Sequence, residues 1–233
     1  MTKRSDKKMA QLQQKILVGV GLFILLILIA GIYYTQTEIT DEFVAGEDYF
    51  LIDNPAPQRP GAKIKVNEFF SYGCIHCKNF DPALDEWVAE RADEINFERT
   101  PAGFNPIWEL LGRTYMSLKA NDALDENHSR IFRAIHDSRR QFLSDEQLAD
   151  FVDGHGISKE VFTRTLNSSE VSRQSNQAKA NMNRYQISGV PTVVIAEKYR
   201  VGMTGGHQRA LAIVDYLIAL ETKPQNSADT ETP

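Results

Sequence analysis

Cysteine is scarce in this chain, whose 233 residues contain only Cys74 and Cys77. A zinc site usually takes four ligands and its cysteines come in two pairs, so the absence of a second pair argues against a metal centre. His76 lies between the cysteines, and the other four histidines are scattered singly. A structural disulfide here would close too small a loop to constrain the unfolded chain much. A redox-active pair is the strongest interpretation, with neither a metal nor a cofactor expected.

Basic residues are outnumbered by acidic ones beyond residue 15. Residues 1–15 carry five lysine or arginine side chains and one aspartate, a local charge of +4, whereas the whole chain has a net charge of −5. The rest of the chain therefore carries a net charge of −9. Because a nucleic-acid-binding surface needs a basic patch, this acidic body argues against nucleic acid as a partner.

Charged residues are absent from residues 16–34, which are rich in isoleucine, leucine and valine. A helix of this length measures about 28 Å, close to the hydrocarbon thickness of a membrane. Lysine and arginine precede this run, and acidic residues follow it. The positive-inside rule then predicts a basic cytoplasmic segment at residues 1–15 and a single transmembrane anchor at residues 16–34, with the later residues outside the cytoplasm.

Two alternatives to an anchor stay open for this apolar run. One is a very apolar core helix, and the other is a cleaved signal peptide. Signal peptides usually have a shorter apolar run of about 7–15 residues followed by a small-residue cleavage site, whereas Ala30 and Gly31 lie inside this run. A cleaved signal would deliver the domain to the same compartment, so export is the more general prediction and anchoring the more specific one.

Both ends of the exported part lack the apolar periodicity of a folded element. Residues 35–45 are polar and acidic, which favours a linker, and residues 223–233 hold no large apolar side chain, which favours a disordered tail. Between them we expect a core in two parts, residues 46–103 and 187–222, separated by a helical insertion at residues 104–186.

Strand and helix patterns support this division. Polar and apolar residues alternate along residues 63–70, as in a strand with one buried face. A helix is expected at residues 74–90, with both cysteines in its first turn and a kink at Pro82. Further strands are expected at residues 47–52, 95–99, 192–196 and 200–203.

The middle of the chain is predicted to be helical throughout. Ser144 and Gln147 fit a capping box at one helix start. The apolar stripes predict helices around residues 107–118, 124–135, 148–152, 161–166 and 171–185, and a last helix around residues 211–218. This order of elements is typical of an α/β core with inserted helices.

The position of the cysteines at a helix start favours a reactive thiol. A helix N-terminus carries partial positive charge and unpaired N–H groups, which favour a thiolate on Cys74, and His76 adds to this effect. The pKa of Cys74 should therefore lie below the ordinary value of about 8.5. A stabilised Cys74 thiolate stabilises the dithiol form and makes the disulfide the stronger oxidant, so donation of the disulfide is the expected direction.

Glu68 is the second candidate, because strand parity places this acid on the same face as apolar residues. Burial would raise its pKa and leave a carboxyl able to exchange a proton with Cys77. The alternatives are a solvated strand edge or an ion pair with a lysine.

Two motifs together carry a family resemblance. Residues 68–77, which read EFFSYGCIHC, resemble the active-site stretch of DsbA-type periplasmic thiol oxidases in the thioredoxin superfamily, and Gly189-Val190-Pro191 matches the second landmark of that family. The resemblance covers roughly residues 47–220. It implies a thioredoxin-like fold with an inserted helical domain, here preceded by the transmembrane helix.

The resemblance also implies roles for individual residues. It implies a cis peptide bond at Val190-Pro191 packed against the disulfide, and a buried Glu68 beneath the second cysteine. As a separate hypothesis, an extended substrate segment pairs with the backbone at Val190 and contacts Ile75. Ile75 departs from the proline of the most familiar members, and this departure bears on the strength of the oxidant.

The expected function is donation of the Cys74-Cys77 disulfide to reduced exported proteins in the periplasm, by a monomer on the bacterial inner membrane. The resemblance implies reoxidation by a quinone-linked membrane partner of the DsbB type. A reductase or isomerase would use the same residues with the opposite redox poise. A non-catalytic thioredoxin-like chaperone is the alternative from another class.

Overall fold

The computed structural model describes residues 15–17, 19–28, 43–55, 57, 59 and 61–222. The chain divides into two units, Met1–Glu42 and Phe43–Pro233. In the first unit the described residues are helical, and none of the helices in the described part of the chain combines the length and apolar character that a membrane span needs. Residues 1–14 of the predicted basic segment, the end of the anchor, most of the linker and the tail lie outside the described residues.

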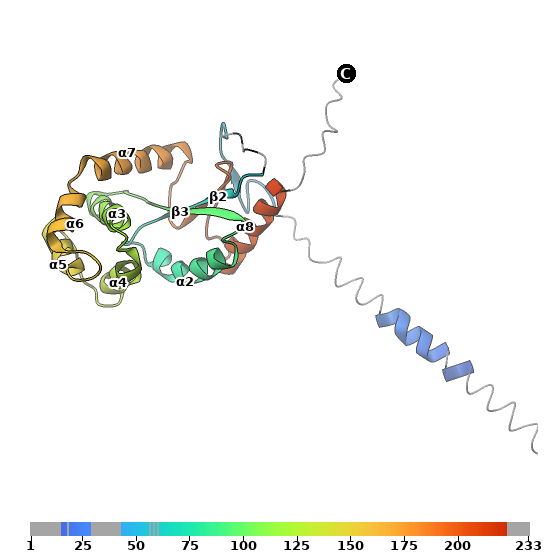
Figure 1. Ribbon diagram of the computed structural model, residues 1–233. Coiled ribbons are helices and arrows are strands. Elements are labelled where there is room, and N and C mark those ends of the chain that lie inside the picture. Colours follow the sequence, from blue (N-terminus) through green and yellow to red (C-terminus); the bar gives the residue numbers. More distant parts are fainter. Residues whose placement is uncertain are drawn as a thin grey trace, which may run out of the picture. The chain divides into compact units, whose positions relative to one another are not determined.

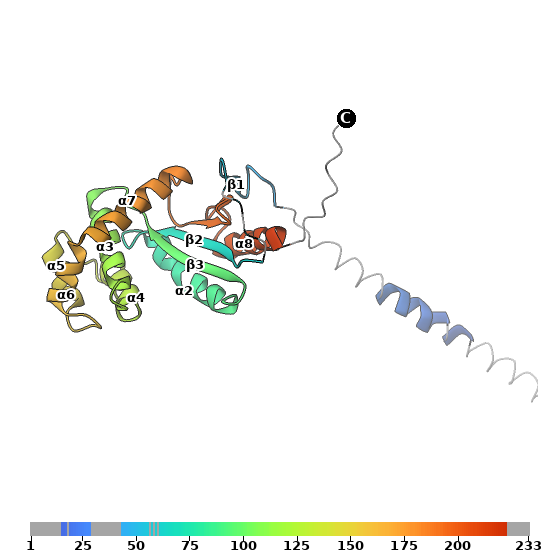
Figure 2. The same cartoon turned by 45° about the horizontal axis from the view of Figure 1, so that its top comes forward.

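The second unit contains a mixed five-stranded sheet (Figures 1 and 2). Its strands are β1 (Phe50–Leu51), β2 (Ile64–Phe70), β3 (Ile95–Pro101), β4 (Thr192–Ile195) and β5 (Tyr199–Val201). The strand order is β1-β5-β4-β2-β3, with β2 parallel to β3 and the other pairs antiparallel. The predicted strands are thus confirmed, although β1 is shorter than expected and β3 is longer.

The two faces of the sheet are covered by different helices. Helices α2 (Ile75–Glu90) and α8 (His207–Thr222) lie on one face, where Ile64 and Val66 of β2 join their apolar core. On the other face Phe69 packs with Tyr185 at the end of α7 (Ser169–Arg184). The C-terminal part of β2, from Glu68 to Phe70, is therefore buried on both sides, and it leads directly into the cysteine motif.

Helix α2 begins one residue later than predicted. Cys74 has extended backbone angles and is the N-cap of the helix, so only Cys77 lies in the first turn. Pro82 lies inside the helix, which continues through it to Glu90. The buried side chains Phe80 and Leu84 attach this helix to the sheet.

The inserted helices gather at one end of the sheet (Figure 1). They are α3 (Pro106–Lys119), α4 (Leu124–His136), α5 (Asp145–Val152), α6 (Lys159–Leu166) and α7. Half of the predicted capping box is confirmed, because the hydroxyl of the N-cap Ser144 accepts the Gln147 N–H; the Gln147 side chain accepts the N–H of Leu143 rather than that of Ser144. The division of the domain into core and insertion stays a prediction, because residues Phe43–Pro233 form a single unit.

Candidate active site

The turn between β2 and α2 positions the first cysteine. The Cys74 N–H donates to the Ser71 carbonyl at 3.0 Å, and the Gly73 N–H donates to the Ser71 hydroxyl at 3.1 Å. The Cys74 sulfur then accepts the backbone N–H of Cys77 at 3.4 Å, as an N-cap side chain does. This contact brings the sulfur to the positive end of the helix, where a thiolate is stabilised.

The two thiols have different surroundings. Both cysteines are free, and Cys74 retains 8% exposure whereas Cys77 is fully buried. Hydrogen bonding from the Cys77 thiol lowers the pKa of Cys74 to about 6, with help from the backbone N–H groups of Cys77 and His76 and from the His76 charge, against the effect of burial. The hydrogen bond to Cys74, burial and the charges of Cys74 and Glu68 raise the pKa of Cys77 well above its ordinary value.

The second landmark lies directly against Cys74. The Val190-Pro191 peptide bond is cis, and the Cys74 sulfur approaches the Val190 carbonyl oxygen at 3.4 Å. Pro191 is buried and Val190 is half-buried, whereas Ile75 and His76 are exposed on the first turn of α2. The structure therefore brings together the residues predicted from the two distant motifs.

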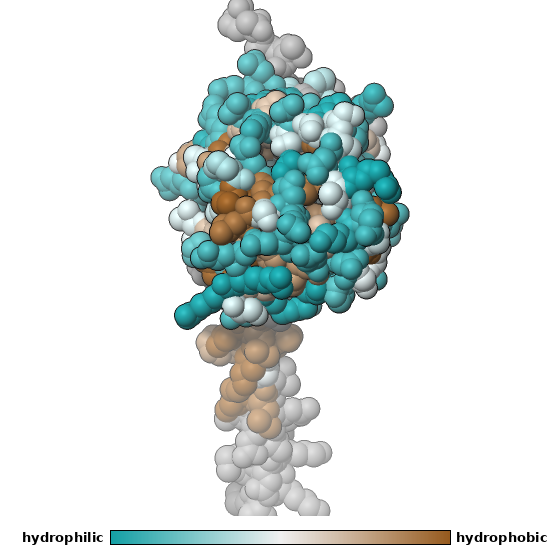
Figure 3. All heavy atoms as spheres, turned by 90° about the vertical axis from the view of Figure 1, so that its left-hand side faces the viewer, coloured by the Kyte–Doolittle hydropathy of each residue, from teal (hydrophilic) through white to brown (hydrophobic). Residues whose placement is uncertain are grey.

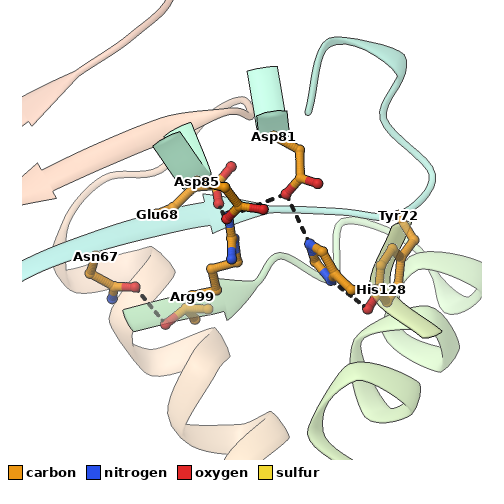
Figure 4. Close-up of polar contacts among 8 residues, drawn as sticks. Asn67, Glu68, Tyr72, Asp81, Asp85, Arg99 and His128 are labelled. Atoms are coloured by element: carbon orange, nitrogen blue, oxygen red, sulfur yellow. Dashed lines mark hydrogen bonds and ion pairs between the residues drawn. The ribbon is translucent and has the colours of Figure 1, made fainter. Parts of the chain in front are cut away.

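Glu68 is buried in an ion pair. Its side chain is on the β2 face predicted by parity, and its carboxylate accepts the Nε–H of Arg99 from β3 at 2.8 Å (Figure 4). Burial raises the pKa of Glu68 to about 7, although the charge and the hydrogen bond of Arg99 lower it. The predicted burial is confirmed, but the partner is an arginine on the neighbouring strand rather than a lysine.

Arg99 forms ion pairs with three carboxylates, and no pattern in the sequence identified it as a site residue. Its guanidinium also approaches Asp81 of α2 at 3.2 Å and Asp85 of the same helix at 2.6 Å. Burial alone would lower the pKa of Arg99, but the charges of the three carboxylates together raise it. The signal in the sequence that could have indicated a basic partner is the i, i+4 spacing of Asp81 and Asp85 on α2. This spacing places two negative charges side by side on one face of the helix.

Gly73 is enclosed by the indole of Trp108, at the start of α3. A Cβ atom at Gly73 would lie 2.4 Å from the Trp108 Nε1 atom. The ring of Phe104 lies beside the same indole at a centroid distance of 5.8 Å. Trp108 therefore packs over the backbone that precedes Cys74, which explains why the motif has glycine at this position.

Comparisons with known proteins agree with this geometry. Residues 108–217 match the family of the DSBA-like thioredoxin domain. The thiol:disulfide interchange protein DsbA of Pseudomonas aeruginosa is 37% identical over 183 residues, which cover 78% of this chain and 87% of the relative. The chain belongs to the DsbA family. The DsbA of Azotobacter vinelandii is 36% identical over 182 residues, which cover 77% of this chain and 85% of that protein.

Solved DsbA structures share the fold. The crystal structure of Pseudomonas aeruginosa DsbA has a TM-score of 0.74 at 36% identity and covers 78% of this chain and 96% of its own. The oxidoreductase DsbA of Xylella fastidiosa has a TM-score of 0.71 at 33% identity, with 77% and 97% covered. The predicted thioredoxin-like fold, with a mixed sheet and helices, is thus confirmed, and the chain is a thiol:disulfide oxidoreductase of the DsbA family.

Substitution Gly73→Ala should disturb the active-site turn, because the new methyl group must displace the Trp108 indole. We expect a loss of about 1–3 kcal/mol in unfolding free energy, measured by urea denaturation, together with slower oxidation of a reduced peptide. Gly202→Ala is the matched control, since a Cβ there meets nothing within 4 Å. Equal effects of the two substitutions would contradict the role of Trp108.

The raised pKa of Glu68 predicts a pH dependence of stability. The folded carboxyl keeps its proton up to about pH 7, whereas the unfolded carboxyl loses it near pH 4.5, so the folded state binds more protons in between. Stability should therefore fall as the pH rises from about 4.5 to 7, by on the order of 3 kcal/mol. Glu68→Gln should remove this component in urea denaturation of the reduced protein. Glu86→Gln, an exposed position of α2, should retain it.

Proposed function

We propose that Cys74 is the residue that exchanges with clients and that Cys77 is its buried partner. A client thiolate attacks the Cys74 sulfur of the oxidised pair, a mixed disulfide forms, and Cys77 leaves as a thiolate. A second client thiolate then attacks the client sulfur of the mixed disulfide and releases Cys74. The client loses two electrons and gains a disulfide, while the pair becomes a dithiol. The greater exposure of Cys74 supports this assignment.

The pKa of Cys74, lowered to about 6, is the observation that supports donation of the disulfide rather than its reduction as the function. A thiolate stabilised at the helix start makes Cys74 a good leaving group and favours the dithiol form, so the disulfide is readily donated.

In this proposal Glu68 supplies a proton to Cys77 when it leaves and takes it back on reoxidation. Its pKa of about 7 and its effect on the Cys77 pKa suit this exchange. His76 helps to hold the Cys74 charge.

The client segment is proposed to lie in an extended form against Val190, with Ile75 as an apolar contact. Ile75 is 43% exposed on the first turn of α2, next to the exchanging sulfur. The Val190 carbonyl, just before Pro191, lies beside Cys74. Backbone pairing of this kind gives affinity with little sequence selectivity, which suits an enzyme with many exported clients.

The chain is further proposed to be anchored in the bacterial inner membrane, with its N-terminus cytoplasmic and its catalytic domain periplasmic. The uncharged run at residues 16–34 and the basic segment before it support this topology. Within the described part of the run, residues 19–28 are helical, and every large apolar side chain there is at least half exposed. Figure 3 shows this stretch as hydrophobic and the folded domain as mostly hydrophilic. A DsbB-type quinone-linked oxidase in the same membrane would reoxidise the monomer.

The redox function is tested by equilibrating the chain with glutathione buffers and measuring the Cys74-Cys77 potential. We expect a value well above the thioredoxin value of about −270 mV, and a value near it would favour a reductase. Cys77→Ala should trap mixed disulfides with exported proteins. Cys74→Ala should abolish both trapping and oxidation of a reduced test protein, and activity in this variant would refute the assignment of Cys74.

The anchor is tested by membrane fractionation of cells that express the chain. We expect the full-length protein in the membrane fraction after alkaline extraction, with its C-terminal domain accessible to protease only after the outer membrane is opened. Ile24→Lys and Leu26→Glu together should release it, because charges inside an apolar span are costly. If cells that express the chain without substitutions yield a shortened, soluble form of it, the apolar run is a cleaved signal peptide instead.

A further inference from the structure

Tyr72 is held at two points by a single helix of the inserted block. Its side chain is almost fully buried, and its hydroxyl lies 2.8 Å from Nδ1 of His128. Its backbone carbonyl accepts Nε2–H of His136 at 2.9 Å. Both histidines belong to α4, although Tyr72 precedes α2 in the active-site turn. Two hydrogen bonds thus join residues that are 56 and 64 positions apart.

Phe132 lies between these two histidines on α4, and its ring contacts both of them and Tyr72. It lies at the middle of an i, i+4, i+8 series on α4, so the three side chains share one stripe. The rings of Tyr72 and Phe132 meet edge to face at 5.0 Å, and the His128 ring lies 5.2 Å from each of them. We call His128, Phe132 and His136 the α4 clamp.

The roles of the His128 nitrogens follow from their partners. Nε2 lies 2.9 Å from an Asp81 carboxylate oxygen, which can only accept, so Nε2 carries a proton; in the neutral imidazole Nδ1 then accepts the Tyr72 hydroxyl. Asp81 in turn approaches Arg99, which binds Glu68. Figure 4 shows the His128 ring between Tyr72 and Asp81. On the side away from Tyr72, His128 is thus held by an ion-paired cluster that consists of Asp81, Asp85, Arg99 and Glu68.

The clamp acts at the turn that sets the position of Cys74. Tyr72 is the neighbour of Ser71, whose carbonyl and hydroxyl hold the N–H groups of Cys74 and Gly73. An ion pair between Lys78 and Asp137 adds a further link from the start of α2 to the end of α4. The sulfur of Cys74 meets the Cys77 N–H only if this turn keeps its shape, so the turn geometry and the thiolate stability are linked.

We propose that Tyr72, held by the α4 clamp, is a positioning residue for the reactive thiol of Cys74. The inserted helical block thereby takes part in setting the oxidising strength of the enzyme. Loss of either hydrogen bond lets the turn relax, weakens the contact between the Cys74 sulfur and the helix start, and makes the disulfide a weaker oxidant. The inference rests on the proposed function of Cys74.

The test is Tyr72→Phe in the full chain in detergent, which removes one hydroxyl. Thiolate absorbance against pH should place the Cys74 titration about one pH unit higher, and the equilibrium constant with glutathione should indicate a disulfide about tenfold less oxidising, or about 30 mV lower in potential. Tyr199→Phe is the matched control: Tyr199 is also buried, and its hydroxyl bonds Glu221 away from the site. This control should lose stability without a change in titration or potential.

A second pair of variants tests the other contact. His136→Leu should shift the Cys74 titration in the same direction, whereas His136→Gln, whose amide can donate to the Tyr72 carbonyl, should restore it. His136 is only half-buried, so this pair stays informative if Tyr72→Phe does not fold. An unchanged titration and potential in His136→Leu, with lower stability alone, would show that the clamp is merely structural and overturn the proposal.

The proposed function is measured separately in the same preparations. Oxidation of a reduced test peptide by the unsubstituted chain reports whether Cys74 and Cys77 donate a disulfide at all. Failure of that reaction would refute the function, while the thiolate titration would still report on the clamp. Normal oxidation by the unsubstituted chain, combined with equal titrations in Tyr72→Phe and Tyr199→Phe, would refute the clamp alone.

Discussion

The contact between the Cys74 sulfur and the start of α2 is the interaction on which the rest of the site depends. A sulfur that caps a helix accepts a backbone N–H and lies in the field of the helix dipole, and both favour its negative charge. The same arrangement buries Cys77 one turn further along. The pair is therefore divided into an acidic thiol that retains slight exposure and a fully buried one of raised pKa, through the hydrogen bond between the two thiols and the helix geometry that places them together.

In the cluster of Glu68, Asp81, Asp85 and Arg99, the cost of burying a carboxylate is opposed by its attraction to a shared arginine. Burial of Glu68 is unfavourable for its carboxylate, and Arg99 offsets only part of that cost because it also serves Asp81 and Asp85. A cation fully committed to Glu68 would hold that acid permanently ionised. Shared among three acids, Arg99 leaves Glu68 with a pKa near neutrality, where a carboxyl can both give and take a proton.

Local patterns were sufficient to predict much of this structure. Alternation predicted β2 and the burial of Glu68, and the two-residue spacing of the cysteines predicted a redox pair at a helix start. The partners of Glu68 and Tyr72 depend on long-range register. Arg99 lies opposite Glu68 only because β2 and β3 pair in parallel at that offset. His128 reaches Tyr72 through the packing of α4, which no periodicity along the chain encodes.

Packing also changes the meaning of the predicted insertion. Phe70, Tyr72, Cys74 and Cys77 belong to the apolar cluster built by α3 to α7, whereas the helix that the cysteines begin packs further along with the sheet and α8. The redox pair therefore lies where the two cores meet, and its immediate surroundings come from the inserted helices. An insertion that supplies these surroundings is part of the site, so changes in its packing should act on the chemistry at Cys74 as well as on the stability of the fold.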